Sequence, residues 1–406
     1  MKTWTKLTLA LLLSLGGLTA CDKDSDEDDF ETVIPETDET PTSAQIKGYV
    51  FYPALTSATT TNVEQLKVPA GFAVNKFAEG IGKPRIMAVT SAGHVYVSDR
   101  DAGTVTLLQD TNNDGVAERK QVVATIKQAH GLAVQGSKLY IVAVKELYVA
   151  DINMDGTLSA PRQLLNDLPD GGQHPNRTLA FGPDGQLYLS VGSTCNSCPE
   201  PNPELATMLV ANPDGSGRRI FAKGLRNTIG FGWHPQTREF WGMDHGIDWL
   251  GDDEQKEELN KITQGADYGW PYIYGEGKYN PGDRPDNMTY AEYAAKTTKP
   301  TLTYQAHSAP MAMVFYTASQ FPAEYQNDAF VAMRGSWNRS KPSGYKVVRV
   351  HFENGQPVRF DDFLTGFLVN NDRSHFARLV GLAVNRDGSL LVSDDTNGVI
   401  YRVARQ

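Results

Sequence analysis

One segment near the middle of the chain combines residue types that bind hard cations. Residues 241–271 read WGMDHGIDWLGDDEQKEELNKITQGADYGWP, rich in carboxylates and with a glycine, Gly246, directly after a histidine. Carboxylate and backbone carbonyl oxygens are the usual ligands of Ca²⁺, and glycine allows a turn whose carbonyls point at an ion. The segment is therefore either a cation site or an acidic surface loop. The charged residues concerned are Asp244, His245, Asp248, Asp252, Asp253, Glu254 and Glu258.

Short strand pairs recur along the chain and determine where this segment lies. Each repeat has an apolar strand, a turn with Gly, Pro, Asn or Asp, and a second β-branched or aromatic strand, which is the pattern of a β-hairpin. Six repeats with strand-like runs between them predict an all-β fold, a six-bladed β-propeller of four-stranded antiparallel blades. The repeats begin at Arg85, His130, Arg177, Asn227, Ala309 and Arg378.

Five further segments have a predicted place in this fold. Residues 66–80 could supply a strand that joins the last blade, and residues 253–262 and 289–296 are the best short helical candidates. Residues 110–121 (DTNNDGVAERKQ) and 151–156 (DINMDG) are similar to calcium-binding loops but lack the acidic twelfth residue. We interpret both as hairpin turns.

The hairpins bring the two ends of each repeat to one rim, because the chain turns at the opposite face of the disc. Several arginines in equivalent positions predict a pocket for an anionic ligand, although propeller rims are often polar. At the starts of the repeats lie Arg85, His130, His174, Arg177, Arg226, Asn227, His307 and Arg378. At the ends lie Asp99, Arg100, Lys145, Asp244, His245, Arg334, Asp394 and Asp395.

The N-terminus predicts export and a lipid anchor. Residues 1–20 hold two lysines and then a short apolar run, which is typical of a secretory signal. Leu18-Thr19-Ala20-Cys21 predicts cleavage before Cys21 and its lipidation, with plain secretion as the alternative. Residues 21–45 are an acidic, Thr- and Pro-rich predicted tether, and residues 46–406 form the predicted propeller domain. We expect the protein on the periplasmic side of a bacterial envelope, anchored to the inner or the outer membrane.

The two remaining cysteines, Cys195 and Cys198, lie in GSTCNSCPEP. A CxxC followed by proline is not a haem attachment signal, and zinc would need a second pair. Outside the cytoplasm this spacing predicts a local disulfide. The formal net charge is −10, much of it in the tether, whereas a nucleic-acid binder would need a basic surface. No nucleic-acid partner is expected.

Four motifs together resemble the soluble quinoprotein sugar dehydrogenases, most closely the sorbosone and pyranose dehydrogenases. They are GLRNTIGFGWHP, DHGIDWLGDDEQKEELNKITQGADYGWP, HPNRTLAFGPDG and FVAMRGSWNRSKPSGYKVVRV. The resemblance covers nearly the whole chain after the tether. It implies pyrroloquinoline quinone (PQQ) in the mouth of a six-bladed propeller with Ca²⁺ beside it, a sugar as substrate, and an external electron acceptor such as a quinone or a cytochrome.

The resemblance also implies residue roles. His174 matches the general base that takes the proton from the sugar hydroxyl, and Arg226 and Asn227 match residues at the quinone oxygens, where Arg226 assists catalysis. Gly246 and Ile247 match the backbone ligands of the catalytic Ca²⁺. The residues expected around the PQQ carboxylates or face are His307, Arg334 and Arg378, to which we add His130. Glu258 and Tyr268 match a second, structural Ca²⁺ site.

One departure and two alternatives stay open at this point. The glucose dehydrogenases of this family have an aspartate before the base, where this chain has Gln173, so the group that orients His174 is not predicted. His245 is interpreted as structural. The chain could instead be a non-catalytic surface propeller that binds a glycan or a protein. A Ca²⁺-dependent lactonase is disfavoured because the rim offers Arg and His rather than Asn, Asp and Glu ligands.

Overall fold

A computed structural model of the protein describes residues 51–280 and 282–406. The predicted signal (residues 1–20), Cys21 and the tether (residues 21–45) lie outside the described residues. The domain boundary at residue 46 lies there as well and stays a prediction. No helix in the described part of the chain is long and apolar enough to cross a membrane.

The described residues form six four-stranded antiparallel sheets, and in four of them all neighbouring strands are consecutive along the chain. Each predicted hairpin supplies the first two strands of one sheet. Sheet one comprises β3 (Pro84–Val89), β4 (Val95–Asp99), β5 (Thr104–Gln109) and β6 (Arg119–Thr125). Sheet two comprises β7 (Gly131–Gln135), β8 (Lys138–Val142), β9 (Leu147–Asp151) and β10 (Arg162–Leu165). Sheet three comprises β11 (Thr178–Phe181), β12 (Leu187–Val191), β13 (Thr207–Ala211) and β14 (Arg219–Lys223).

Two of the remaining three sheets, sheets four and six, include a strand from a more distant part of the chain. Sheet four comprises β15 (Gly230–Trp233), β16 (Phe240–Asp244), β17 (Glu257–Lys261) and β20 (Leu302–Tyr304). Sheet five comprises β21 (Pro310–Phe315), β22 (Ala329–Met333), β23 (Lys346–Glu353) and β24 (Gln356–Leu364). Sheet six comprises β27 (Leu379–Val384), β28 (Leu390–Asp394), β29 (Val399–Arg405) and β2 (Phe72–Glu79). The antiparallel pairing of β2 with β29 confirms the predicted role of residues 66–80.

Short elements cover the rim. β1 (Ala54–Leu55), β25 (Leu368–Val369) and β26 (Ser374–His375) form a three-stranded sheet, and β18 (Ile273–Tyr274) pairs with β19 (Lys278–Tyr279). The helices are α2 (Thr60–Glu64), α3 (Tyr290–Ala294) and the 3₁₀ turn η1 (Ala323–Tyr325). Helix α3 confirms the helical prediction for residues 289–296. Thr289 and Glu292 form a capping box at its N-terminus.

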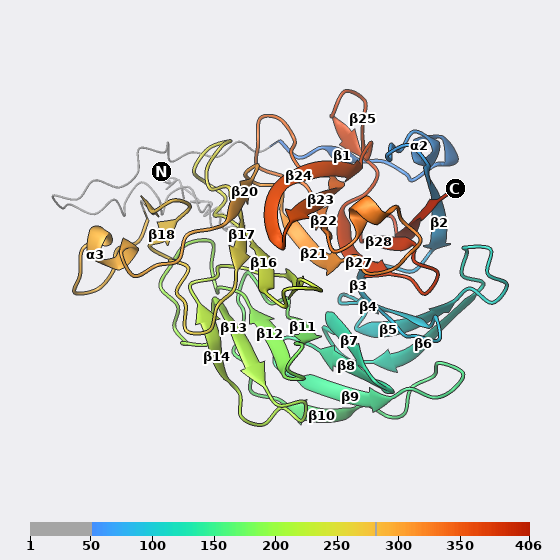
Figure 1. Cartoon of the computed structure of the whole chain (residues 1–406), viewed down its shortest axis with the longest axis horizontal. Helices are drawn as coiled ribbons and strands as arrows, with labels where there is room; N and C mark the ends of the chain where they lie inside the picture. Colours follow the sequence, from blue (N-terminus) through green and yellow to red (C-terminus); the bar gives the residue numbers. More distant parts are fainter. Residues whose placement is uncertain (1–50, 281) are drawn as a thin grey trace, which may run out of the picture.

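The sheets are arranged around a common centre with their first strands innermost (Figure 1). Strand β3 contacts β7 and β27, β11 contacts β7, and β21 contacts β15 and β27. The approach is close: a Cβ on Gly230 in β15 would lie 2.0 Å from the carbonyl oxygen of Met311 in β21. Buried serines join neighbouring sheets, since Ser393 Oγ donates to Arg85 O at 2.7 Å and Ser98 Oγ to His130 O at 2.6 Å. The arrangement is of the propeller type.

Packing between sheets explains the strand sequences. The second strands β4, β12, β16, β22 and β28 are buried along their whole length, because each sheet is covered on both faces by its neighbours. Such strands read as continuous apolar runs rather than as alternating patterns. The helical prediction for residues 253–262 is wrong for the same reason. Within this segment Glu257–Lys261 forms β17, which pairs with β16 on one side and β20 on the other, and that pairing outweighs the local helix propensity.

Aspartates at the ends of second strands confirm the predicted convergence at one rim. Asp99 accepts a hydrogen bond from the Lys83 N–H at 2.8 Å, at the start of the same hairpin. Asp244 accepts from the Arg226 N–H at 2.8 Å and Asp394 from the Arg378 N–H at 2.9 Å. In three sheets, therefore, one carboxylate fixes the start of the first strand against the end of the second.

Candidate functional site

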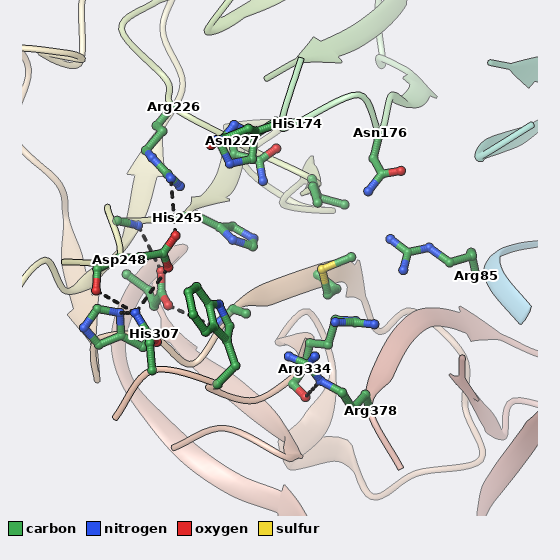
Figure 2. Close-up of a pocket in the computed structure, with 18 residues that line it drawn as sticks. Arg85, His174, Asn176, Arg226, Asn227, His245, Asp248, His307, Arg334 and Arg378 are labelled. Atoms are coloured by element: carbon green, nitrogen blue, oxygen red, sulfur yellow. Dashed lines mark hydrogen bonds and ion pairs between the residues drawn. The ribbon is translucent and has the colours of Figure 1, made fainter. Parts of the chain in front are cut away.

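A cavity of about 450 Å³ lies at the centre of this rim. Its wall contains most of the residues that the sequence motifs single out: His174, Arg226, Asn227, Gly246, His307, Arg334 and Arg378. They come from the loops before the first strands and after the second strands of four different sheets. In Figure 2, Arg85, Arg334 and Arg378 lie on one side of the cavity, and Asp248 and His307 lie on the opposite side.

His174 is held in one orientation by the loop that follows β12. Its Nδ1 lies 2.9 Å from the Ser193 carbonyl oxygen and 2.8 Å from Ser193 Oγ, so Nδ1 carries the proton and Nε2 keeps its lone pair. Burial, and then the charge of Arg226, place the pKa of His174 well below its ordinary value. A Cβ on Gly192 would lie 2.7 Å from the His174 Cβ and 2.8 Å from Asn227 Oδ1. Glycine at this position therefore lets both residues approach the same point.

Ser193, rather than Gln173, orients the His174 ring. Gln173 lines the cavity, but Ser193 makes the contacts to the His174 ring. Both the backbone carbonyl and the hydroxyl of Ser193 contact Nδ1, and the carbonyl leaves no signal in the sequence. Neutral imidazole with a free Nε2 is the form that a general base requires.

Arg226 and Asn227 are positioned by Asp244 and by the disulfide loop. Asp244 is buried and accepts hydrogen bonds from the Arg226 N–H, the Asn227 N–H and Thr228 Oγ1, each at 2.8 Å. The Arg226 guanidinium donates to Asn196 O at 3.0 Å and to Asn196 Oδ1 at 2.6 Å.

Asn196 lies between the two cysteines of the predicted disulfide. Cys195 and Cys198 are bonded, which confirms that prediction. The disulfide therefore stiffens the loop that fixes the Arg226 guanidinium at the cavity wall.

Three arginines lie on the other side of the cavity, and two of them share one carboxylate. Asp395 accepts from Arg85 at 2.5 Å and from Arg334 at 2.9 Å. Arg378 instead donates to Gly335 O at 2.6 Å and lies over the Tyr52 ring. The Nε atoms of Arg85 and Arg334 are buried and have no hydrogen-bond partner among the described residues. This wall therefore carries more positive charge than its own carboxylates balance, and anions bind well to such a surface.

Two residues of the predicted ring lie away from the cavity. His130 is 1% exposed; its Nδ1 lies 2.9 Å from Arg177 O and its Nε2 lies 3.1 Å from the Arg85 guanidinium. Arg177 is fully buried and donates to His174 O at 2.9 Å and to Pro169 O at 2.8 Å. Arg177 therefore fixes the loop of His174, and His130 supports Arg85. His130 can act on a ligand of this cavity only through Arg85.

Carboxylate oxygens lie next to Gly246 at the cavity wall. Gly246, Asp248 and Glu257 line the cavity, and Glu257 Oε1 accepts from the Ala309 N–H at 2.9 Å. Burial raises the pKa of Glu257 to about 8, and the charge of Asp248 contributes to the increase. Ile247 is fully buried and donates its N–H to Gln255 Oε1 at 3.1 Å. A buried carboxylate with a raised pKa beside a second carboxylate is an environment that a divalent cation would stabilise.

The predicted second cation site has a cavity of its own. Glu258 and Tyr268 both line a small cavity of about 20 Å³ that borders the central one at Gly246. Burial raises the pKa of Glu258 to about 7.

Elsewhere, the Asp110, Asp114 and Glu118 carboxylates lie within 4.8 Å of one another in the turn between β5 and β6. The turn prediction is confirmed for residues 110–118, whereas residues 119–121 already belong to β6.

The two other histidines of the cavity are engaged by backbone oxygens. His307 Nε2 lies 2.8 Å from Gly251 O and His245 Nε2 lies 2.5 Å from Pro310 O. Burial lowers the pKa of His245 to about 4, which agrees with its interpretation as structural.

The sequence analysis did not predict several residues of the cavity wall: Asn176, Glu257, Met311, Trp337 and Asn338. Trp337 and Asn338 lie within the quoted motif FVAMRGSWNRS, which was the available signal.

The fold and the cavity together define a propeller-type protein with a basic central pocket that contains a neutral histidine and a carboxylate cluster. The chain belongs to the TrAA12-like family, whose model matches residues 66–406.

Two related proteins align over most of their own length. A protein of Borreliella burgdorferi described as uncharacterized is 32% identical and covers 86% of this chain and 93% of its own length. The pyrroloquinoline quinone-dependent sugar dehydrogenase of Hypocrea jecorina is 25% identical, with 84% of this chain and 91% of that protein covered.

Two solved structures share the fold. The calcium structure of the Trichoderma reesei enzyme of carbohydrate-active family AA12 has a TM-score of 0.73 at 22% identity and covers 88% of this chain and 98% of that chain. The holo form of the PQQ domain of Coprinopsis cinerea pyranose dehydrogenase has a TM-score of 0.71 at 22% identity, with 88% and 100% covered. These matches establish the propeller-type all-β fold of the chain.

Proposed function

We propose that this protein is a PQQ- and Ca²⁺-dependent dehydrogenase that oxidises a sugar, either an aldose or a sugar aldehyde such as sorbosone. The observation that carries the proposal is the meeting of three features in one cavity. These are the free Nε2 of His174, the arginine wall, and the oxygens around Gly246. Similarity to other proteins supports the same function, because the relatives include PQQ-dependent sugar and pyranose dehydrogenases.

The cavity fits PQQ in charge and in size. PQQ is a planar tricarboxylate, and Arg85, Arg334 and Arg378 offer guanidinium donors, two of them with buried Nε atoms that have no partner among the described residues. The volume of about 450 Å³ lies in the ~300–1,000 Å³ range of small-molecule sites. Arg226 and Asn227 would bind the quinone oxygens. Gly246 and Ile247 would supply carbonyl ligands to Ca²⁺, beside the carboxylates of Asp248 and Glu257.

When bound, PQQ supplies the quinone that accepts a hydride, and Ca²⁺ supplies a Lewis acid beside it. His174 takes the proton of the sugar hydroxyl at Nε2, while its Nδ1–H remains bonded to Ser193. The positive charge of Arg226 stabilises negative charge that develops next to it. Because Asp244 and Asn196 fix Arg226 in advance, little reorganisation is needed when the reaction occurs.

The proposal includes a closed six-bladed propeller, in which β2 and β29 from opposite ends of the chain complete the last blade. It also includes the lipid anchor at Cys21, which would hold the enzyme at the periplasmic side of the envelope. Electrons would leave to an external quinone or cytochrome, because the CxxC of this chain lacks the histidine of a haem attachment signal.

Reconstitution tests this function. The chain without residues 1–21 would be mixed with PQQ and Ca²⁺, and dye reduction followed with a panel of aldoses and with sorbosone. We expect sugar-dependent reduction that requires both PQQ and Ca²⁺. Binding of PQQ without turnover of any sugar would refute the substrate class. Failure to bind PQQ would refute the dehydrogenase and favour a glycan-binding propeller.

A further inference from the structure

Two more cavities lie at the same rim, one beside the central cavity and the other beyond it. The inner of these has a volume of about 350 Å³ and shares Arg85, Asn176 and Arg334 with the central cavity. The outer has a volume of about 440 Å³ and shares Arg100 with the inner one. Since each neighbouring pair has wall residues in common, the three cavities form a row that leads outward from His174. Each volume is in the usual range for small-molecule sites.

This row is basic although the protein is acidic. The basic side chains of the two added cavities are Lys83, Arg85, Arg100, Lys127, Lys145 and Arg334. Their acidic side chains are Asp101, Glu146, Asp170 and Asp395. The formal net charge of the whole chain is −10, so a basic excess along one row is a local feature of these walls. Such a row attracts anionic ligands and repels cations.

Ion pairs already engage most of these basic groups. Lys83 pairs with Asp101 at 2.6 Å, and Lys145 pairs with Asp170 at 3.2 Å. Arg85 and Arg334 share Asp395. These side chains therefore shape the row but have part of their charge balanced.

Arg100 differs from them. It follows β4 and lines both added cavities, yet within the described residues its guanidinium makes no hydrogen bond and no ion pair, and its Nε is buried without a partner. A buried charged donor without a partner is costly. A carboxylate or sulfate on a ligand would satisfy it, because the guanidinium presents parallel donors that match two oxygens. Arg100 thus marks the boundary of the two cavities as a place for an anionic group.

We propose that the substrate is an acidic oligosaccharide whose reducing end reacts beside His174 and whose anionic sugar units occupy the two added cavities, with Arg100 as their main contact. This inference rests on the proposed dehydrogenase function and adds the substrate class. Carboxylate (uronate) and sulfate groups share the chemistry that Arg100 recognises. A monosaccharide would fill only the central cavity and leave Arg100 without a partner.

Binding to the protein without PQQ is the first test, because it does not depend on turnover. Titration calorimetry would measure trigalacturonic acid, a sulfated galactose trisaccharide and a neutral galactose trisaccharide. We expect Arg100→Gln to weaken binding of the anionic ligand roughly tenfold or more, the scale of one hydrogen bond to a charged group. Binding should also weaken as salt is added. Of the two anionic ligands, the one that binds more tightly identifies the charged group.

The matched control is Arg162→Gln. Arg162 is exposed on β10, the outermost strand of its sheet, and its side chain also makes no hydrogen bond or ion pair with the described residues. It carries the same charge change away from the row, so anion binding should stay at the wild-type level. Thermal melting would verify that both variants fold.

Steady-state kinetics separate this inference from the function on which it rests. With PQQ and Ca²⁺, Arg100→Gln should raise KM for the acidic trisaccharide and leave kcat, and the kinetics of the neutral trisaccharide, unchanged. Oxidation of neutral sugars with no preference for acidic ones, and no effect of Arg100→Gln on binding, would overturn the substrate class alone. Arg100-dependent anion binding without oxidation of any sugar would overturn the dehydrogenase and support the anion site.

Discussion

Replacing His174 with asparagine tests the proposed base most directly. The asparagine amide can replace the Nδ1–H donor that lies 2.9 Å from Ser193 O, but it has no basic nitrogen where Nε2 lies. The loop should therefore keep its shape, and the free energy of unfolding should change by no more than about 1 kcal/mol, the net contribution of one neutral hydrogen bond. Loss of a general base costs about 10²–10⁴-fold in rate. That corresponds to about 3–5 kcal/mol of transition-state stabilisation.

The assay is dye reduction by the reconstituted variant, with kcat and KM measured for the best sugar and PQQ affinity measured separately by titration. We expect kcat to fall by the stated factor while PQQ affinity stays close to that of the wild type. His94→Asn is the matched control, because His94 is half-buried at the turn between β3 and β4, on the face opposite the cavity. It should leave both quantities unchanged.

The pH dependence of the wild type gives an independent readout. Neutral imidazole is the active form, and burial together with Arg226 disfavours its protonation. The acid limb of kcat/KM should therefore lie below pH ~6.5, the ordinary value for histidine. Wild-type kcat in His174→Asn, or an acid limb at or above pH ~6.5 that His174→Asn leaves in place, would refute His174 as the base.

Three further predictions follow from the groups around the cavity. The double change Cys195→Ser and Cys198→Ser should lower the free energy of unfolding by about 2 kcal/mol, the loop-closure value for so short a loop. It should also weaken PQQ binding, because Asn196 no longer holds Arg226 in place. Urea unfolding and PQQ titration measure the two effects, and an unchanged PQQ affinity would contradict the second. Asp244→Asn should lower the free energy of unfolding by about 1.5–3 kcal/mol, since a charged acceptor of buried hydrogen bonds is lost. An unchanged midpoint of urea unfolding would show that this carboxylate does not organise the loop. Because burial raises the pKa of Glu257 to about 8 without a cation, Ca²⁺ binding should displace a proton. The affinity for Ca²⁺ should therefore rise with pH up to about 8 and should fall in Glu257→Gln. Calorimetry in two buffers of different ionisation enthalpy measures the proton release, and a Ca²⁺ affinity that does not vary with pH would exclude Glu257 as a ligand.

Much of the site could be predicted because its signals are local or repeat. The ends of the hairpins determine which residues reach the rim, and the observed cavity contains His174, Arg226, Arg334 and Arg378 as expected. The disulfide between Cys195 and Cys198 follows from spacing and compartment. Residues near the start or end of a strand inherit their position from the strand pattern alone. Periodicity is therefore a sufficient guide to which residues meet, although not to which way each side chain points.

Side-chain direction was decided by packing between distant segments. His130 and Arg177 satisfy the same positional rule as Arg85, yet both are buried against neighbouring loops, because their donors find backbone carbonyls there. The group that orients His174 is the Ser193 carbonyl, and every residue has such an oxygen, so the sequence carries no mark of it. Residue type alone could not separate a side chain of the cavity wall from one that supports it.

The amino-acid sequence by itself determined the hairpin repeats, the chemistry available at the rim and the resemblance to a family, because each of these is written in short patterns. The tertiary structure decided the rest. Glu257–Lys261, within the segment expected to be helical, became a strand only because β16 and β20 pair with it on both sides, and β20 lies some forty residues farther along the chain. The row of cavities beyond Arg85 likewise depends on loops from different sheets meeting in space. Hydrogen-bond pairing and burial between segments far apart in sequence supplied the free energy for both, and no local pattern encodes it.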